Sequence, residues 1–329
     1  MTKNGIQLVG AGMQTQRNIL PALLLCGAQI DSITTRSVEH AAAAAQKFGL
    51  SARAYAGLDA MLAAEQGGKA VVVMQAKDAV PAVMRCLAAG KEVFVEKPCG
   101  MSPAEAQAVY EASRASGKGV LVGFMKRFAP VYRKLKEVLD GGELGGVRSF
   151  RAAFCVDASR FCQSDADFVY FVAIHMLDLL RYLFGEVRSV HVQKNELGGG
   201  CSYAAVFCME NGVIGTASFE NRTAWTRESE SICVTLENGF AESRELNRLT
   251  LHRSAAANAP WQSLSERDDV FSDCFNPASG TEKDIFLRGF AGEMREFWEH
   301  GAAVSDDNLH TTRLCEAFLN ALGENGKTQ

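Results

Sequence analysis

The sequence predicts an α/β protein whose N-terminal half is a doubly wound parallel sheet and whose C-terminal half is an open, mostly antiparallel sheet with helices. Over about the first 120 residues short apolar strands alternate with helical segments, which is typical of a parallel sheet covered on both faces. After Gly123 strand-like segments follow one another, and Glu210-Asn211-Gly212 is a strong hairpin turn between two of them. The 329 residues suit about two domains, which we expect over residues 1–123 and 124–329.

Each element of the first domain has a local signal. Gly49 and Gly90 would end two helices, and Ser102-Pro103 is a cap followed by proline at the first helical position. The expected strands are Ile6–Val9, Ile30–Thr34, Ala70–Met74, Glu92–Val95 and Gly119–Gly123. The first expected helix ends near Leu25, and the second starts from the alanine run Ala41–Ala45. The third covers Val80–Ala89, and the fourth starts at Pro103.

The second domain is expected to place helices on one face of its sheet. Its expected strands are Val147–Val156, Ser189–Gln193, Tyr203–Met209, Val213–Phe219 and Ser231–Leu236. Its expected helices are Pro130–Leu139, Val169–Phe184, 286–299 and 307–322. Residues 253–285 are rich in Ala, Ser, Asn and Asp and predict a long loop.

Composition and charge exclude several classes of protein. With 47% hydrophobic and 22% charged residues, the chain is globular rather than disordered or fibrous. The 34 basic and 38 acidic residues give a net charge of −4, so we expect no nucleic-acid partner. The apolar runs Ile19–Ile33 and Val169–Phe184 are interrupted by polar residues, and the N-terminus has no signal-peptide pattern. We therefore expect no membrane partner and a cytoplasmic location.

Ten cysteines are scattered along the chain without a CxxC pair. A free cysteine behaves as a small apolar residue, and we expect free thiols in a reducing compartment. The Cys155/Cys162 and Cys201/Cys208 pairs have six-residue gaps and no histidine partner, so we expect no metal.

A glycine-rich turn follows the first strand and opens the first helix. In a dinucleotide-binding turn the first glycine permits a tight bend, and the second lets a pyrophosphate approach the backbone. We therefore expect Gly10, Gly12, Met13 and Gln14 to bind a dinucleotide, although Thr15 replaces the third glycine.

The second strand runs out in Thr34-Thr35-Arg36-Ser37, without the acidic residue that usually binds the ribose diol of NAD. Asp31 is acidic but lies near the middle of the run. Without a carboxylate, a 2′-phosphate meets no repulsion, and Thr35, Arg36 and Ser37 could bind one. Arg36 could instead stack on the adenine of either cofactor. We expect NADP or NAD, with NADP favoured.

A charged pair ends a buried strand in Val93-Phe94-Val95-Glu96-Lys97-Pro98. At the carboxyl edge of a parallel sheet such side chains face the ligand crevice, so Glu96 and Lys97 are candidate site residues. A surface ion pair at a strand end is the alternative interpretation. Pro98 would fix the turn, and a cis peptide bond is one way to do so.

Together these motifs resemble the glucose–fructose oxidoreductase/inositol dehydrogenase (Gfo/Idh/MocA) family. The similarity includes the glycine turn, Glu96-Lys97-Pro98 and three further runs: 122–128 (VGFMKRF), 173–180 (AIHMLDLL) and 183–187 (LFGEV). The resemblance covers nearly the whole chain. It implies an N-terminal Rossmann domain, a C-terminal α/β domain, and oxidation or reduction of a carbon in sugars, cyclitols and related polyols. It also implies a homodimer or homotetramer, which an open sheet face favours.

The resemblance implies roles that the chemistry also supports. Hydride transfer from a C–H next to an O–H needs a base for the proton and a cation beside the developing alkoxide. Lys97 would orient the hydroxyl and stabilise that charge, and His175 would exchange the proton. Glu96 would lie by the nicotinamide ribose. Gln75, after the fourth strand, is a further candidate for binding the cofactor, and Arg127 for binding the substrate.

One departure from the family pattern concerns the helix that carries His175. Helical spacing puts Phe171, His175, Asp178 and Tyr182 on one face, so Phe171 and Asp178 are candidates for lining a substrate pocket. An aspartate commonly stands in the family where this chain has Phe171. Losing a carboxylate beside a lysine and a histidine should alter the proton path.

The leading hypothesis is an NAD(P)-dependent oxidoreductase acting on a CH–OH group of a sugar, nucleotide sugar or cyclitol. One alternative is redox-assisted glycoside cleavage or elimination with the cofactor held bound, and net consumption of free cofactor separates the two. The other is a catalytically impaired dinucleotide-binding protein. Phe171 and Thr15 motivate that interpretation, whereas the retention of Lys97 and His175 counts against it.

Overall fold

The chain divides into two compact units in a computed structural model that describes residues 5–66, 68–255, 265–274 and 283–325. The first unit consists of Met1–Met125 and Gly289–Arg313, and the second of Lys126–Arg288 and Leu314–Gln329. The sequence analysis predicts a single domain boundary, near residue 123. The structure also groups residues 289–313, which the sequence analysis placed in the second domain, with the first unit.

The first unit contains a six-stranded parallel sheet within its described residues, in the order β3-β2-β1-β4-β5-β6. This order confirms the predicted doubly wound sheet, and the topological switch point lies between β1 and β4. Its strands are β1 (Ile6–Val9), β2 (Ile30–Thr35), β3 (Arg53–Ala56), β4 (Lys69–Val72), β5 (Glu92–Val95) and β6 (Val120–Val122).

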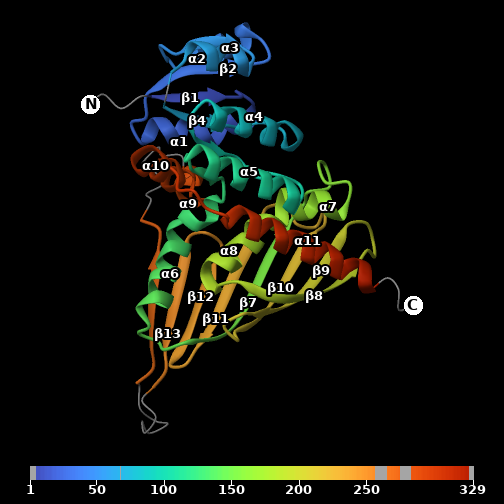
Figure 1. The fold of residues 1–329 in the computed structure, drawn as a ribbon. Coiled ribbons are helices and arrows are strands. Elements are labelled where there is room, and N and C mark those ends of the chain that lie inside the picture. The colour runs from blue at the N-terminus through green and yellow to red at the C-terminus, as the bar shows by residue number, and fades with distance from the viewer. Residues whose placement is uncertain (1–4, 67, 256–264, 275–282, 326–329) are drawn as a thin grey trace. The chain divides into compact units, whose positions relative to one another are not determined.

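Helices join the strands of this sheet, as Figure 1 shows in blue to green. They are η1 (Thr15–Ile19), α1 (Leu20–Leu25), α2 (Val38–Lys47), α3 (Leu58–Ala64), α4 (Ala76–Ala88) and α5 (Pro103–Ser116). The predicted cap at Ser102 is confirmed, because its side chain accepts a hydrogen bond from the N–H of Glu105. The sequence analysis missed β3 and α3, because β3 is a half-exposed edge strand without an apolar run.

The helix α10 (Phe290–His300) joins the first unit through specific contacts. The ammonium of Lys69 donates hydrogen bonds to the carbonyl oxygens of Phe297 and Trp298, at 2.7 and 2.8 Å. The thiol of Cys26 lies 3.4 Å from the carbonyl oxygen of Ala291. These bonds between distant parts of the chain explain why residues 289–313 pack with the parallel sheet.

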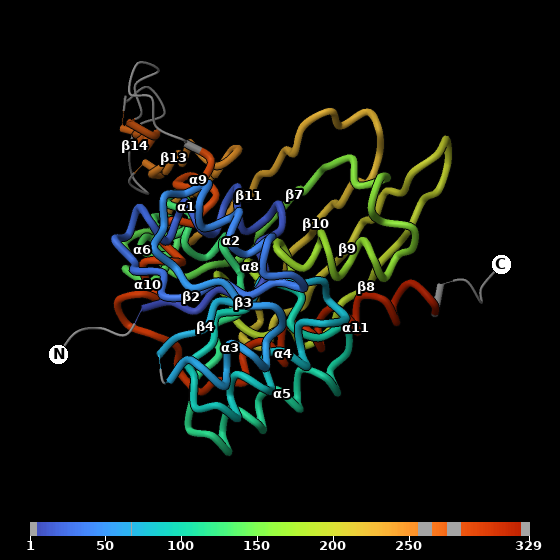
Figure 2. Tube along the Cα trace, turned by 90° about the horizontal axis from the view of Figure 1, so that it is seen from above, coloured from blue at the N-terminus to red at the C-terminus, as the bar shows by residue number. Residues whose placement is uncertain are grey.

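The second unit contains an eight-stranded sheet within its described residues, in the order β14-β13-β12-β11-β7-β10-β9-β8. Its pairs are antiparallel except β7 with β10, which confirms the predicted mostly antiparallel sheet. Figure 2 shows β7, β10, β9 and β8 following one another across it. The strands are β7 (Val147–Val156), β8 (Val187–Asn195), β9 (Cys201–Met209), β10 (Ile214–Asn221), β11 (Ser229–Leu236), β12 (Gly239–Arg244), β13 (Arg248–Arg253) and β14 (Arg267–Ser272).

Helices lie over one face of this sheet, with α6 and α8 in front of the strands in Figure 1. The helical elements are η2 (Met125–Phe128), α6 (Pro130–Gly141), α7 (Asp165–Phe168), η3 (Val169–Ala173), α8 (Ile174–Phe184), α9 (Lys283–Leu287) and α11 (Asp307–Asn325). Two of them cross the boundary between the units, η2 after Met125 and α11 after Arg313. None of the described helices combines the length and apolar content needed to cross a bilayer.

Two predictions for the second half of the chain need correction. Residues 253–285 are not one loop, because β14 pairs with β13 and α9 begins at Lys283. Residues 256–264 and 275–282 of that segment lie outside the described residues. The predicted helix over 169–184 is divided into a π-helical segment, η3, and the α-helix α8.

The hairpin between β9 and β10 is confirmed. The N–H of Met209 donates to the carbonyl oxygen of Val213 at 2.8 Å, and Gly212 has a φ of +88°. Along these strands Phe207 and Ala217 are buried on the face that packs inward, whereas Val206 and Ile214 on the other face are 46% and 57% exposed. The sheet is therefore open on one side, as the sequence predicts.

Candidate active site

The turn between β1 and η1 carries two glycines with different structural requirements. Gly10 has a φ of +95°, and a Cβ there would overlap the carbonyl oxygen of Val73, so the protein itself requires glycine. At Gly12 a Cβ would meet no described atom within 4 Å. The packing of the protein does not explain the second glycine, whereas a phosphate approaching the backbone does.

Thr15 occupies the place of the third glycine. Its side chain is fully buried, and its hydroxyl donates a hydrogen bond to the carbonyl oxygen of Gly10 at 3.0 Å. The π-helical segment η1 begins at this residue. Because a π turn is wider than an α turn, it leaves room for a side chain where glycine would allow closer packing on the strand.

A cavity of about 800 Å³ opens beside the glycine turn, within the first unit. Its wall comes from that turn, the end of β2, α2, the start of α3 and the turn before α4. Its volume lies in the range of sites that bind cofactors and other small molecules. The residues expected to bind a dinucleotide include Glu96 and Lys97, which do not line this cavity. Those that do are Gly10, Gly12, Met13, Gln14, Thr35, Arg36 and Gln75.

Two neutral side chains and one cation line the cavity at the carboxyl end of β2: Thr34, Thr35 and Arg36. Asp31 lies near the other end of the strand, where its carboxylate accepts a hydrogen bond from the N–H of Gly5 at 2.8 Å. Asp31 is therefore not placed to bind a ribose diol in the cavity. Ser37, which is not among the lining residues, caps α2 by accepting a bond from the backbone N–H of His40.

Positive charge predominates among the described residues that line the cavity. Arg36, Lys47 and Lys77 contribute basic side chains to the lining, and Asp78 contributes an acidic one. Such a lining favours an anionic ligand, which includes the phosphates of a dinucleotide. The sequence analysis did not single out Lys47, Lys77 or His40, because none of them belongs to a local motif.

The Glu96-Lys97-Pro98 turn follows β5 and is tied to the glycine turn. The buried carboxylate of Glu96 accepts hydrogen bonds from the side-chain amide of Gln14 at 2.8 Å and from the N–H of Lys97 at 3.2 Å. Gln14 in turn accepts a hydrogen bond from Asn18 at 2.7 Å. Because Gln14 also lines the cavity, Glu96 is bonded to a residue of the cavity wall, although Glu96 and Lys97 are not themselves lining residues.

Further contacts hold the same turn from its other side. The Lys97–Pro98 peptide bond is cis, and Asn308 of α11 donates a hydrogen bond to the carbonyl oxygen of Cys99 at 2.9 Å. The side chain of Lys97 remains half-buried. Neither Asn18 nor Asn308 gave a signal in the sequence, because each acts on a residue far along the chain.

His175 lies in the second unit, in the first turn of α8, and is half-buried. Phe171 is also half-buried but belongs to the preceding π-helical segment η3. Three-residue spacing places His175 and Asp178 on one face of α8, and the face that Phe171 would share with them stays a prediction.

Asp178 is held by Arg127 in a buried, bidentate ion pair. The side chain of Asp178 is 1% exposed, and its two oxygens accept hydrogen bonds from Nε and Nη2 of Arg127 at 2.7 and 2.5 Å. The guanidinium of Arg127 also lies 5.5 Å from the ring centre of Tyr182. The structure thus gives Arg127 and Asp178 a mutual contact, and their contact with a substrate stays a prediction.

The neighbouring Lys126 is buried and faces other carboxylates. Its ammonium contacts Glu230 and lies 3.2 Å from Glu228, while the hydroxyl of Tyr132 donates to Glu230 at 2.6 Å. Burial disfavours the charged lysine, but the two carboxylates outweigh it and raise the pKa of Lys126. Lys126 and Arg127 are therefore each fixed by carboxylates of the second unit.

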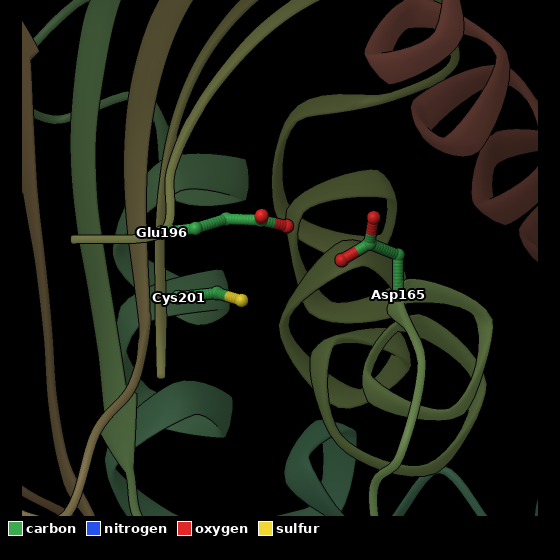
Figure 3. Close-up of side chains that lie close together, drawn as sticks. All are labelled: Asp165, Glu196 and Cys201. Carbon is green, nitrogen blue, oxygen red and sulfur yellow. The ribbon is translucent and has the colours of Figure 1, made fainter. Parts of the chain in front are cut away.

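A cluster of possible metal ligands lies elsewhere in the second unit, where Figure 3 shows Asp165, Glu196 and Cys201 turned toward one another. Their ligand atoms lie within 4.8 Å of each other. The ammonium of Lys194 binds Asp165 at 2.7 Å and also contacts Glu196. An ammonium of the protein thus already contacts both carboxylates, so the cluster gives no specific evidence for a metal.

The sequence matches two family descriptions. Residues 5–124 match the oxidoreductase family with an NAD-binding Rossmann fold (GFO_IDH_MocA), and residues 132–242 match the GFO/IDH/MocA C-terminal domain. The chain belongs to the Gfo/Idh/MocA family. Its first unit is accordingly an NAD-binding Rossmann domain, and the protein belongs to a family of oxidoreductases.

Several relatives of known activity are similar to this Gfo/Idh/MocA chain. A trans-1,2-dihydrobenzene-1,2-diol dehydrogenase of Mus musculus is 32% identical over 46% of each chain. An inositol 2-dehydrogenase of Burkholderia lata is 31% identical over 55% of this chain and 54% of that protein. The matched region thus spans about half the length of these two relatives.

Two further matches extend over nearly the full length of this chain. A 4-carboxy-2-hydroxymuconate-6-semialdehyde dehydrogenase of Sphingobium is 26% identical over 97% of this chain and 96% of that protein. The crystal structure of a dehydrogenase from Chromobacterium violaceum superposes with a TM-score of 0.87 at 20% identity, over 99% of this chain and 97% of that one. The similarity to the Chromobacterium violaceum structure shows that the two chains share a fold.

The two glycines of the turn should respond differently to substitution by alanine. Gly12→Ala should leave the melting temperature unchanged and weaken NAD(P)H binding at least roughly tenfold, because its Cβ enters only the space that a phosphate would occupy. Gly10→Ala should instead lower the melting temperature, since its Cβ meets the Val73 carbonyl. Thermal unfolding and titration of NAD(P)H fluorescence measure both effects. Unchanged binding in Gly12→Ala would contradict the assignment of this turn.

Removing the charge of Asp178 should destabilise the protein. Asp178→Asn leaves the Arg127 guanidinium with a weaker partner, and breaking a buried ion pair costs about 3–5 kcal/mol. Chemical denaturation monitored by circular dichroism measures this loss, with the exposed pair residue Glu137→Gln as control. A stability equal to the wild type, combined with a raised KM, would show that Asp178 acts on substrate instead.

Proposed function

We propose that the protein transfers a hydride between NADP(H) or NAD(H) and a CH–OH or C=O carbon of a cyclic polyol or sugar. One observation carries the proposal: a glycine turn beside a cation-lined cavity is hydrogen-bonded, through Gln14 and Glu96, to the turn that presents Lys97. An anionic cofactor and a lysine are thereby available at the carboxyl ends of β1 and β5, two strands of one sheet with β4 between them.

The residues of the cavity suit a dinucleotide. Gly12 leaves the backbone open to a pyrophosphate, and the start of η1 directs N–H groups toward it. When bound, the nicotinamide group accepts or supplies the hydride. The backbone of this turn would hold the cofactor, and Thr35 and Gln75 line the same cavity.

We assign the acid–base chemistry to Lys97 and His175. The ammonium of Lys97 would hold the substrate oxygen and stabilise negative charge on it as the C–H bond breaks. The imidazole of His175 would accept the hydroxyl proton during oxidation and return it during reduction, since its ordinary pKa is near neutrality. The proposal requires both groups to act on the same substrate molecule.

The choice between the two cofactors follows from the end of β2. Asp31 is engaged with Gly5, and Arg36 lines the cavity instead of a carboxylate. A carboxylate there would repel a 2′-phosphate and an arginine attracts one. We therefore propose that the protein prefers NADP(H).

The relatives support a substrate with neighbouring hydroxyl groups on a ring. Their names describe dehydrogenation of a dihydrobenzenediol and of inositol, and both are cyclic alcohols. We propose a substrate of this class, in which the oxidised carbon carries a secondary hydroxyl. Bound-cofactor glycoside cleavage differs from this reaction because it consumes no free cofactor.

Replacement of Lys97 tests the proposal. Lys97→Met should reduce turnover of cyclic diols and polyols by about 100-fold or more, because it removes the cation beside the developing alkoxide. NAD(P)H binding should stay within about twofold, since the cofactor is held at the glycine turn. Steady-state formation of NAD(P)H across a panel of cyclic diols, inositols and sugars measures the first effect, and fluorescence titration the second.

Lys118→Met, in the same unit, is the matched control and should behave as the wild type. Persisting turnover in Lys97→Met would refute the role of the lysine. If the wild type binds NAD(P)H but oxidises nothing in the panel, the protein is a dinucleotide-binding protein without this activity.

We further propose that the open face of the eight-stranded sheet pairs with a second copy of the chain. Val206 and Ile214 are exposed there, and exposed apolar side chains on a flat sheet favour association. Sedimentation velocity should show a dimer or tetramer for the wild type and a monomer for a Val206→Glu/Ile214→Glu variant. Val304→Glu, at an exposed apolar residue of the first unit, is the control. A monomeric wild type at micromolar concentration contradicts the proposal.

A further inference from the structure

Lys47 reaches the glycine turn from the far end of α2. Its ammonium donates a hydrogen bond to the side-chain oxygen of Gln16 at 2.9 Å. The amide nitrogen of the same Gln16 donates to the carbonyl oxygen of Ala11 at 2.8 Å. Gln16 therefore bridges the lysine to the middle of the Gly10-Ala11-Gly12 turn, and Lys47 lines the same cavity.

The face of α2 that borders the cavity explains why Lys47 lines it. His40, Ala43, Ala44 and Lys47 all line the cavity, and their spacing of three and four residues puts them on one side of the helix. The two alanines in the middle are small, so they leave a passage between the start of the helix and Lys47. Polar groups that can carry positive charge lie at both ends of this passage.

We propose that Lys47, together with Arg36, binds the 2′-phosphate of NADP(H) and sets the preference for that cofactor. The inference rests on the proposed function, because it assumes that the cavity holds a dinucleotide. A phosphate monoester carries close to two negative charges at neutral pH, so it needs more neutralisation than the pyrophosphate, which the N–H groups of the turn can bind. Arg36 offers a planar guanidinium and Lys47 a compact point charge, and both types bind phosphate.

The other charged groups of the lining fit this assignment. Lys77 and Asp78 belong to the start of α4 rather than to β2 or α2, and their charges are of opposite sign. Lys47 is the lysine that α2 contributes to the lining. Its ammonium contacts the side-chain oxygen of Gln16 at 2.9 Å and lies 5.5 Å from the ring centre of Phe48, and both of these partners are neutral.

The proposal is tested by measuring how four ligands bind to the wild type and to variants of Lys47. NADPH, NADH, 2′-AMP and 5′-AMP are titrated against the wild type, Lys47→Met and Lys47→Arg, by cofactor fluorescence or calorimetry. Lys118→Met serves as a control that changes the net charge equally. Lys47→Met should weaken NADPH and 2′-AMP roughly tenfold, the effect of losing one hydrogen bond to a charged group, and leave NADH and 5′-AMP within about twofold. Lys47→Arg should restore most of the affinity for NADPH.

The affinity of the wild type for NADPH should also fall with added salt more steeply than that of Lys47→Met, because an exposed cation is screened. An equal loss for NADPH and NADH in Lys47→Met would overturn the inference and leave the proposed function standing, since the lysine would then support the turn through Gln16. Unchanged NADPH affinity, or a wild type that binds NADH as tightly as NADPH, would also overturn it. A folded wild type that binds neither cofactor would refute the proposed function itself.

Discussion

The close approach of the glycine turn to the end of β4 is the constraint on which the candidate site depends. Gly10 has no side chain beside the Val73 carbonyl, and its positive φ lets the chain turn directly from β1 into η1. Gln14, just before η1, then donates a hydrogen bond to Glu96, so that the segments after β1 and β5 are linked across the end of β4. The cavity and the lysine turn are therefore positioned by the same backbone geometry.

Charges serve different purposes in the two units. Those around the cavity, such as Arg36 and Lys47, line a space large enough for an anionic ligand. Those of η2 in the second unit are buried and paired: Arg127 with Asp178, and Lys126 with two glutamates. A buried charge is costly without a partner, so these pairs tie η2 to α8 through Asp178 and to β11 through Glu230.

Local signals predicted much of the fold and part of the site. The alternation of apolar strands and helices foresaw the parallel sheet, and the Asn-Gly hairpin was correct because its turn chemistry is local. Edge elements such as β3 and β14 were missed, since half-exposed strands lack an apolar run. The π-helical form of residues 169–173 was also missed, because the apolar run that predicts a helix does not distinguish an α-helix from a π-helix.

Local patterns identify most strands of the parallel sheet, the glycine turn, the Glu96-Lys97-Pro98 motif and the absence of an acid at the end of β2. Each of these depends on neighbouring residues, whose preferences are readable without a fold. The hydrogen bond between Gln14 and Glu96, 82 positions away, and the bridge from Lys47 to the glycine turn become visible only in the folded chain. Contacts of this kind arise from strand order and from the direction of helix faces, because these bring together side chains that no local pattern relates.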